Sequence, residues 1–438
     1  MSTKKIPIVA KELLVPFIII TSLFALWGFA NDVTNPMVTA FKKVMPELSW
    51  FEAYLVQFAF YFGYGCMAIP AALFIRWKSY KSGILLGLVL YATGAFLFYP
   101  ASAMENYTFF LISLYVITCG LALLETTANP LVLSLGAHET ATQRLNLAQS
   151  FNPMGSLTGM MVAQFVVLNQ IQSKNYDAAS YEALDAATKA GIKTSDLAII
   201  STPYLSIGVV VLAVLAIMFF VKIPTVQEHD GLTFKESMDK LFAKKAFFPG
   251  VLAQMFYVGG QIMCWTAIFQ YVEYMNISEG RDLTATYWNM LAMGIFLVGR
   301  FFGTALLSKI RAPRLLYTFA FLAITCCVLA IVLPGMIGLV SLVCISLFMS
   351  VMFPTIYGIA LKDMGDEAKL GSAFLVMAIV GGAIFPPLQG LIIDIGGVNL
   401  DDTLILGVPE VKFSFIMPML CISFVAMYGL YVSKLKED

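Results

Sequence analysis

One carboxyl group lies in an apolar stretch, where an ionisable side chain is energetically unfavourable and therefore suggests a function. Glu125 lies in LALLETTANP, among Leu, Ala and Thr, and a charged turn begins only at His138. If this stretch crosses a membrane, the carboxyl group lies near mid-membrane, where an ionisable group costs about 2.5 to 3.5 kcal/mol. Burial favours the neutral, protonated form of a carboxyl group. Glu125 is therefore predicted to bind and release a proton; a structural glutamate hydrogen-bonded between helices is the alternative.

Amide side chains accompany this glutamate at helical spacing. Asn129 follows Glu125 by one turn, and Gln149 and Asn152 stand three residues apart at the start of the next apolar stretch. Residues three or four apart share one face of a helix. Amides both donate and accept hydrogen bonds, which suits the hydroxyl groups of a sugar. We expect these amides to bind such a solute; hydrogen bonding between helices is the alternative.

The first apolar stretch carries a second polar stripe. Trp27, Asn31 and Asn35 recur every four residues in FALWGFANDVTNP. An aromatic platform flanked by amides is the usual lining of a sugar site, so we expect these three residues to bind substrate. Packing between helices is the alternative for Trp27. Asp32 either carries a second proton-linked charge or pairs with a basic residue near the helix end.

A later stretch, GQIMCWTAIFQY, carries an amide and an indole one turn apart. Gln261 and Trp265 are predicted substrate ligands. Gln254 and Tyr257 precede them on the same face, and Gln254 is expected to pack between helices. Tyr357 is a weaker candidate for substrate binding on the same argument.

The composition identifies a polytopic membrane protein. Of 438 residues, 59% are hydrophobic and 12% are charged, and the mean hydropathy is +0.83, whereas soluble domains carry about 25% charged residues. The zero formal net charge and the lack of a basic tail argue against a nucleic-acid partner. The seven cysteines lie in apolar runs without metal-ligand spacing. No nucleophile and base pair or glycine-rich phosphate loop is found either, so we expect neither an enzyme nor a cofactor.

Twelve apolar stretches are each long enough to span a bilayer as a helix. They lie near 13–41, 52–75, 82–100, 107–134, 145–170, 201–223, 247–273, 284–308, 314–333, 337–361, 371–394 and 412–433. An even number of spans places both termini on one side. That side collects 20 of the 27 lysines and arginines and the other side 7, which predicts that both termini are cytoplasmic.

The stretches divide into two similar sets of six. We expect an N-terminal half at 1–223, a cytoplasmic linker at 224–246 and a C-terminal half at 247–438. An NP pair and an FP pair, at 129–130 and 353–354, are each followed by a short charged turn. Counting back five residues from each proline gives Glu125 in one half and Met349 in the other. Glu125 therefore has no acidic counterpart in the second set of six stretches, which favours a functional role for it over a structural one.

These features resemble the major facilitator superfamily. More narrowly, FALWGFANDVTNP, ALLETTANP, QRLNLAQSFNPMGS, GQIMCWTAIFQY and FPTIYGIALKDMG resemble the bacterial L-fucose:proton symporter family and its glucose/galactose permease relatives. The resemblance implies an all-α membrane fold of twelve transmembrane helices in two pseudo-symmetric six-helix halves. It also implies that Glu125 matches the family's essential intramembrane glutamate. The family's first helix usually carries an acid at the position of Asn35, whereas this chain has Asp32 three residues earlier.

Three arginines resemble the cytoplasmic gate charges of the superfamily. They are Arg76, Arg144 and Arg300. A solvated cluster that sets membrane orientation is the alternative for these charges. Arg300 is flanked by apolar residues and glycines, so we expect it to be more buried than a solvated cluster would be.

The resemblance implies a symporter of the bacterial inner membrane that imports L-fucose with a proton by alternating access. We expect a monomer whose partners are the sugar, the proton and the lipid bilayer. A glucose/galactose or N-acetylglucosamine permease is the alternative, with sodium as an alternative coupling ion. A sugar sensor that does not transport is a further alternative from a different class.

Overall fold

The computed structural model describes residues 9, 11–136, 144, 147–149, 151–176, 178–221, 234–307, 310–362, 364, 368–396 and 403–435. Within these residues, twelve helical segments are long and apolar enough to cross a membrane. They are Leu14–Val44, Trp50–Ile75, Tyr80–Ala103, Tyr107–Asn129, Leu147–Leu168, Ala186–Phe220, Phe247–Glu279, Ala285–Leu307, Ala312–Val332, Gly335–Ala360, Leu370–Gly396 and Glu410–Lys434. The predicted set of twelve spans is confirmed.

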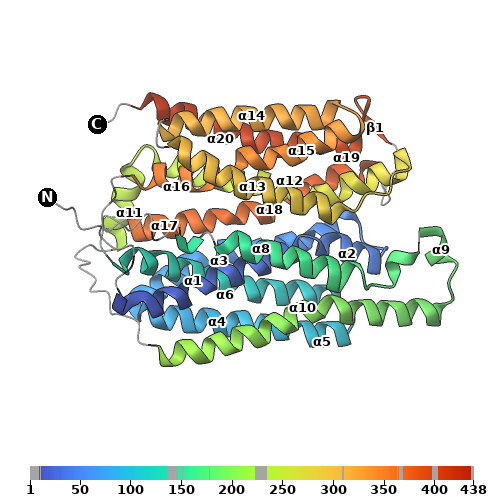
Figure 1. Ribbon diagram of the computed structural model, residues 1–438, viewed down its shortest axis with the longest axis horizontal. Coiled ribbons are helices and arrows are strands. Elements are labelled where there is room, and N and C mark those ends of the chain that lie inside the picture. The colour runs from blue at the N-terminus through green and yellow to red at the C-terminus, as the bar shows by residue number, and fades with distance from the viewer. Residues whose placement is uncertain are drawn as a thin grey trace.

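The helices before the central linker lie together in the lower part of Figure 1. They are α1 (Leu14–Thr34), α2 (Met37–Val44), α3 (Trp50–Trp77), α4 (Tyr80–Phe96), α5 (Phe98–Ala103), α6 (Tyr107–Ser134), α8 (Phe151–Val162), α9 (Ala178–Glu182) and α10 (Ala186–Phe220), with short helical turns η1 (Lys11–Leu13), η3 (Ala163–Leu168) and η4 (Ser173–Asn175). The π-helical η3 continues α8. We call this group the first half.

The remaining helices form the upper part of Figure 1, here called the second half. They are α11 (Phe234–Ala243), α12 (Phe247–Glu279), α13 (Ala285–Leu307), α14 (Ala312–Val332), α15 (Gly335–Met349), α16 (Met352–Ala360), α17 (Ala368–Met377), α18 (Gly381–Ile393), α19 (Glu410–Phe413) and α20 (Ile416–Lys434), with η5 (Ala378–Val380) and η6 (Asp394–Gly396). Strands β1 (Leu404–Ile405) and β2 (Val408–Pro409) pair antiparallel. Both chain ends lie at one end of the bundle (Figure 1), here called the terminal end; α2, α9 and β1 lie at the opposite, remote end.

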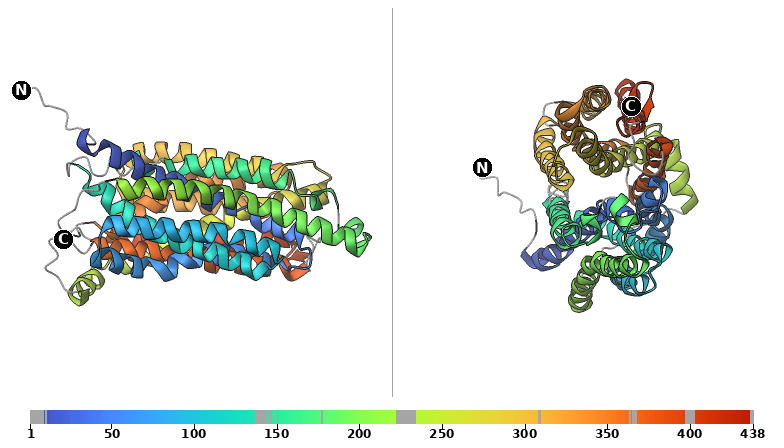
Figure 2. Two further views of the ribbon diagram at one scale, coloured as in Figure 1. Left: turned by 90° about the horizontal axis from the view of Figure 1, so that it is seen from below. Right: turned by 90° about the vertical axis from the view of Figure 1, so that its right-hand side faces the viewer.

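Side-chain caps and one proline set several helix limits. Ser49 and Glu52 form a capping box that begins α3, and Pro36 separates α1 from α2. Asp185 accepts hydrogen bonds from the backbone N–H groups of Ala187 and Thr188, so α10 begins about 15 residues before the predicted start near 201. The early start was missed because the first turns of α10 are polar, and its N-terminal part extends beyond the bundle (Figure 2).

Close backbone contacts bring the site helices together. A Cβ atom on Gly28 of α1 would lie 2.2 Å from the Asn152 carbonyl oxygen, and one on Gly155 of α8 would lie 2.0 Å from the Ala25 carbonyl oxygen. Only glycine permits such an approach of two helix backbones. The contact sets the polar faces of α1 and α8 against each other.

Helix α3 of the first half packs closely against α18 of the second half. A Cβ atom on Gly390 of α18 would lie 3.0 Å from Cδ2 of Tyr54 and 3.2 Å from the Phe51 backbone. At the remote end, the Asp394 carboxylate accepts hydrogen bonds of 2.9 Å from the backbone N–H groups of Trp50 and Phe51. The first half therefore contacts the second along α3.

Candidate functional site

A cavity of about 150 Å³ lies between the two halves. The first half contributes lining residues from α1, α3, α6 and α8, and the second half contributes residues from α12, α13, α16 and η5. Nine of the predicted site residues line it, namely Trp27, Asn31, Asp32, Glu125, Gln149, Asn152, Gln261, Trp265 and Arg300. The structure thus brings together residues that are up to 273 positions apart in the chain, from Trp27 to Arg300.

Two acids of the first half face this cavity. Glu125 of α6 lines the wall and accepts a hydrogen bond from the hydroxyl group of Tyr64 on α3. Asp32 of α1 is 1% exposed and accepts hydrogen bonds from Asn35 Nδ2 at 2.9 Å and Asn31 Nδ2 at 3.4 Å. A carboxyl group in such surroundings exchanges a proton readily only if the cavity admits water.

Amides hold the wall formed by α1, α6 and α8. Gln149 Nε2 donates to Asn129 Oδ1 at 3.2 Å, and Asn129 Nδ2 donates to the Glu125 carbonyl oxygen at 3.1 Å. Asn152 Nδ2 donates to the Phe24 carbonyl oxygen at 3.3 Å and so ties α8 to α1. Asn129 does not line the cavity; it orients Gln149, which does.

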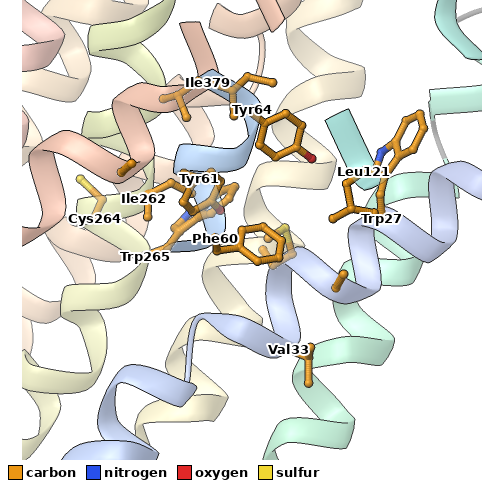
Figure 3. Close-up of a cluster of buried hydrophobic side chains, with 14 of the residues drawn as sticks. Trp27, Val33, Phe60, Tyr61, Tyr64, Leu121, Ile262, Cys264, Trp265 and Ile379 are labelled. Carbon is orange, nitrogen blue, oxygen red and sulfur yellow. The ribbon is translucent and has the colours of Figure 1, made fainter. Parts of the chain in front are cut away.

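Aromatic rings and one cation form the opposite wall. Trp265 of α12 is 5% exposed, donates its indole N–H to Ser346 Oγ at 3.1 Å, and packs edge-on against Phe296 at 5.1 Å. The Arg300 guanidinium lies over the Phe296 ring at 4.9 Å, and its Nε donates to the Ser350 carbonyl oxygen at 3.3 Å. Trp265 shares a buried cluster with Trp27, which comes from the first half (Figure 3). Flat faces in such a wall suit the apolar face of a sugar ring.

Three further predicted residues lie away from the cavity wall. Asn35 is fully buried behind Asp32, and Tyr357 stacks on Phe353, which does line the cavity. Arg144 is buried between α6 and α8, and its Nε donates to the Val132 carbonyl oxygen at 2.7 Å.

Arg76 lies in the last turns of α3, and its side chain is outside the described part of the structure. Arg300, grouped with the gate charges from the sequence, lies in the cavity wall. Of Arg144 and Arg300, the two gate arginines whose side chains the structure describes, Arg300 is the one that lines the cavity.

Sequence reasoning missed the tyrosines of α3. Tyr61 and Tyr64 line the cavity, and Figure 3 shows both in a cluster of buried side chains that includes Trp27 and Trp265. Gln57, Tyr61 and Tyr64 lie at positions i, i+4 and i+7 of a largely apolar helix, which was the available signal. It was hard to recognise because the chain holds 19 tyrosines.

A twelve-span bundle with a polar cavity between two halves, lined by intramembrane acids and amides, defines a secondary transporter. A family model described as "Major Facilitator Superfamily" matches residues 13–387. The chain belongs to this superfamily. The predicted fold class is therefore confirmed.

The curated relatives are sugar transporters. The chain is 51% identical to the L-fucose-proton symporter of Haemophilus influenzae over 427 residues, which cover 96% of this chain and 97% of that one. It is 34% identical to the L-fucose-proton symporter of Escherichia coli, with 97% and 94% covered. It is 31% identical to the glucose/galactose transporter of Brucella abortus, with 95% and 93% covered.

Solved structures agree with these relatives. A crystal structure of the E. coli fucose:proton symporter matches with a TM-score of 0.73 at 32% identity and covers 97% of this chain and all of that one. A second crystal structure, described as the outward conformation of a Major Facilitator Superfamily transporter, matches with a TM-score of 0.74 at the same identity and coverage.

Proposed function

We propose that this protein is a proton-coupled symporter that imports L-fucose by alternating access. The observation that carries the proposal is the carboxyl group of Glu125 in a cavity shared by the two halves. Identities of 51% and 34% to L-fucose-proton symporters over almost the whole chain support the choice of sugar.

The residues that line the cavity divide into those that bind the proton, those that hydrogen-bond the sugar and those that pack against its ring. Glu125 carries the proton, with Asp32 as a second acid in the same cavity. Gln149, Asn152 and Asn31 hydrogen-bond sugar hydroxyl groups, and on the facing wall Gln261 does the same. Trp27 and Trp265 pack against the ring.

Import follows from the order in which proton and sugar are bound. A proton from outside binds the Glu125 carboxylate and gives a neutral carboxylic acid, the form that favours sugar binding. After the halves rock, the acid releases the proton inside and the sugar leaves. One charge moving through 100 mV supplies about 2.3 kcal/mol, which supports more than tenfold accumulation.

The protein lies in the bacterial inner membrane as a monomer with both termini in the cytoplasm. The excess of lysine and arginine on the terminal side supports this orientation. The halves are residues 1–223 and 247–438, joined by a cytoplasmic linker at 224–246. With this orientation, the remote end faces the periplasm.

The test is uptake of labelled L-fucose into vesicles under an imposed pH gradient without sodium. Wild type is expected to accumulate the sugar, whereas Glu125→Gln is expected to lose accumulation and keep exchange of sugar for sugar. Glu182→Gln, the same change at an exposed site on α9, is the matched control and is expected to accumulate normally. Normal accumulation by Glu125→Gln would refute the role of this carboxyl group.

Competing sugars decide the substrate. Uptake of glucose or galactose in place of L-fucose would refute L-fucose as the substrate and would not contradict the proposed transport mechanism. The 31% identity to a glucose/galactose transporter makes these sugars the relevant competitors.

A further inference from the structure

Asp32 accepts hydrogen bonds from two neighbouring amides, Asn31 and Asn35, and from the Ser156 hydroxyl group of α8. Asn35 Nδ2 donates to Oδ1 at 2.9 Å, and Asn31 Nδ2 donates to Oδ2 at 3.4 Å. Each carboxylate oxygen therefore has an amide donor. Hydrogen bonds donated to a carboxylate stabilise its ionised form relative to the neutral acid. The orientation of the two amides thus affects how easily Asp32 takes up a proton.

Both amides are oriented by side chains of α3. Gln57 Nε2 donates to Asn35 Oδ1 at 3.1 Å, and the Tyr61 hydroxyl group donates to Asn31 Oδ1. With their oxygen atoms occupied in this way, Asn35 and Asn31 present their NH₂ groups to Asp32. Gln57 and Tyr61 are four residues apart and share one face of α3.

The same two side chains contact the second half of the molecule. Gln57 Nε2 also donates to Thr266 Oγ1 of α12 at 3.2 Å, and both residues are fully buried. The Tyr61 ring packs on Gly382 of α18 so closely that a Cβ atom there would lie 2.7 Å from Tyr61 Cγ. Each donor to Asp32 is therefore two contacts away from the opposite half.

We infer that Gln57 and Tyr61 are positioning residues that couple the ionised form of Asp32 to the contact between the two halves. When α3 lies against α12 and α18, the two side chains hold both amides as donors, and the carboxylate is favoured. When the halves separate along α3, Gln57 and Tyr61 lose the groups that orient them, and Asp32 accepts a proton from water to become a carboxylic acid. By linkage, protonation of Asp32 favours separation to the same extent.

Release of the proton from Asp32 when the halves meet along α3 agrees with the symport proposed above. The biological role of this coupling rests on that proposed function. Gln57 and Tyr61 lie in the half of α3 nearer the remote end, so their contacts with the second half form when the halves close at that end, the state in which a symporter releases its proton inside. Other groups that face Asp32 or share its cavity are the Ser156 hydroxyl of α8, Glu125 of α6 and Arg300 of α13. Glu125 has to be removed for Asp32 to be observed alone.

The test is a pH titration of intrinsic tryptophan fluorescence on purified full-length protein in proteoliposomes, in a Glu125→Gln background and without sugar. Trp27 and Trp265 line the cavity and report its state. Thr266→Val keeps the shape of the side chain and removes the bond to Gln57, at a residue that does not line the cavity. We expect it to raise the pH midpoint by roughly 0.5 to 1 unit, because protonation becomes about three- to tenfold easier when one hydrogen bond is lost.

Further variants separate coupling from a general effect on packing. Gln57→Leu and Tyr61→Phe are expected to raise the midpoint in the same direction. Thr118→Val makes the same change at a buried threonine whose hydroxyl group bonds within α6 and is expected to leave the midpoint unchanged. Asp32→Asn is expected to abolish the transition.

Two results overturn the inference. A transition that persists in Asp32→Asn shows that another group titrates, and an unshifted midpoint in Thr266→Val shows that the halves are not coupled to the acid. Because the readout needs no sugar, failure of L-fucose uptake in vesicles would refute the proposed function and leave this test valid.

Discussion

Replacing Asp394 by asparagine should weaken the contact between the halves at the remote end. The carboxylate of Asp394, at the start of η6, accepts the backbone N–H groups of Trp50 and Phe51, the first two residues of α3. Ser49 satisfies the third N–H group, that of Glu52. The N-terminus of α3 is thus capped partly from its own half and partly from the other.

The expected effect follows from charge and hydrogen bonding. An anion at a helix N-terminus contributes about 0.3 to 1 kcal/mol and up to about 2 kcal/mol when partly buried. Asparagine removes the charge and offers one acceptor oxygen, so one of the two N–H groups of α3 loses its partner at a further cost of about 1 kcal/mol. A total of about 2 kcal/mol shifts the equilibrium away from the joined form by about 30-fold.

A distance measurement between spin labels tests this shift. Labels on cysteines introduced at Gln170 and Leu406, both exposed, report the separation of the halves in a chain whose seven cysteines are replaced by alanine. Asp394→Asn is expected to increase the population with long distances. Ser49→Ala is the matched control, because it removes a cap within one half and weakens both forms alike. A distance distribution for Asp394→Asn that matches wild type would refute the reasoning.

Three further predictions concern a contact between the halves, a ring of the cavity wall and an amide that orients a cavity residue. Gly390→Ala should shift the spin-label distances as Asp394→Asn does, since the new Cβ atom would lie 3.0 Å from Tyr54; an unchanged distribution contradicts this. Trp265→Ala should weaken sugar binding at least tenfold by calorimetry, because a buried ring of the cavity wall is lost; unaltered affinity argues against its role. Asn129→Leu should raise the KM for exchange with little change in kcat, since Gln149 loses the oxygen that orients it; an unchanged KM would show that Gln149 does not need this support.

The spacing of polar residues predicted which helices meet at the cavity but not how each side chain is used. Trp27 and Asn31 line the cavity as the four-residue period predicted, whereas Asn35 lies behind Asp32. The Asn35 side chain is held away from the cavity because its Nδ2 donates to Asp32 and its Oδ1 accepts a hydrogen bond from Gln57. Asp32 lines the cavity although it lies off that stripe, and its carboxylate accepts hydrogen bonds from Asn31 and Asn35.

Contacts between distant helices could not be predicted from the spacing of residues. Gln57 is one glutamine in an apolar helix, and nothing in the sequence pairs it with Thr266, 209 positions later. Asp394 likewise is the last residue of the predicted stretch 371–394 and has no sequence feature that pairs it with α3, yet it caps that helix of the other half. Both roles depend on tertiary packing, which a period along one chain segment does not encode.

The distribution of charge between the halves gives a reason for coupling through α3. Both acids of the cavity, Asp32 and Glu125, belong to the first half, and the second half supplies the cation Arg300. A proton that arrives on either acid changes the charge of one half only, so it alters how that half interacts with the other. Helix α3 hydrogen-bonds Glu125 through Tyr64 and contacts the amides of Asp32 through Gln57 and Tyr61. Because the same helix packs along α18, a change of charge at either acid acts on the surface where the halves meet.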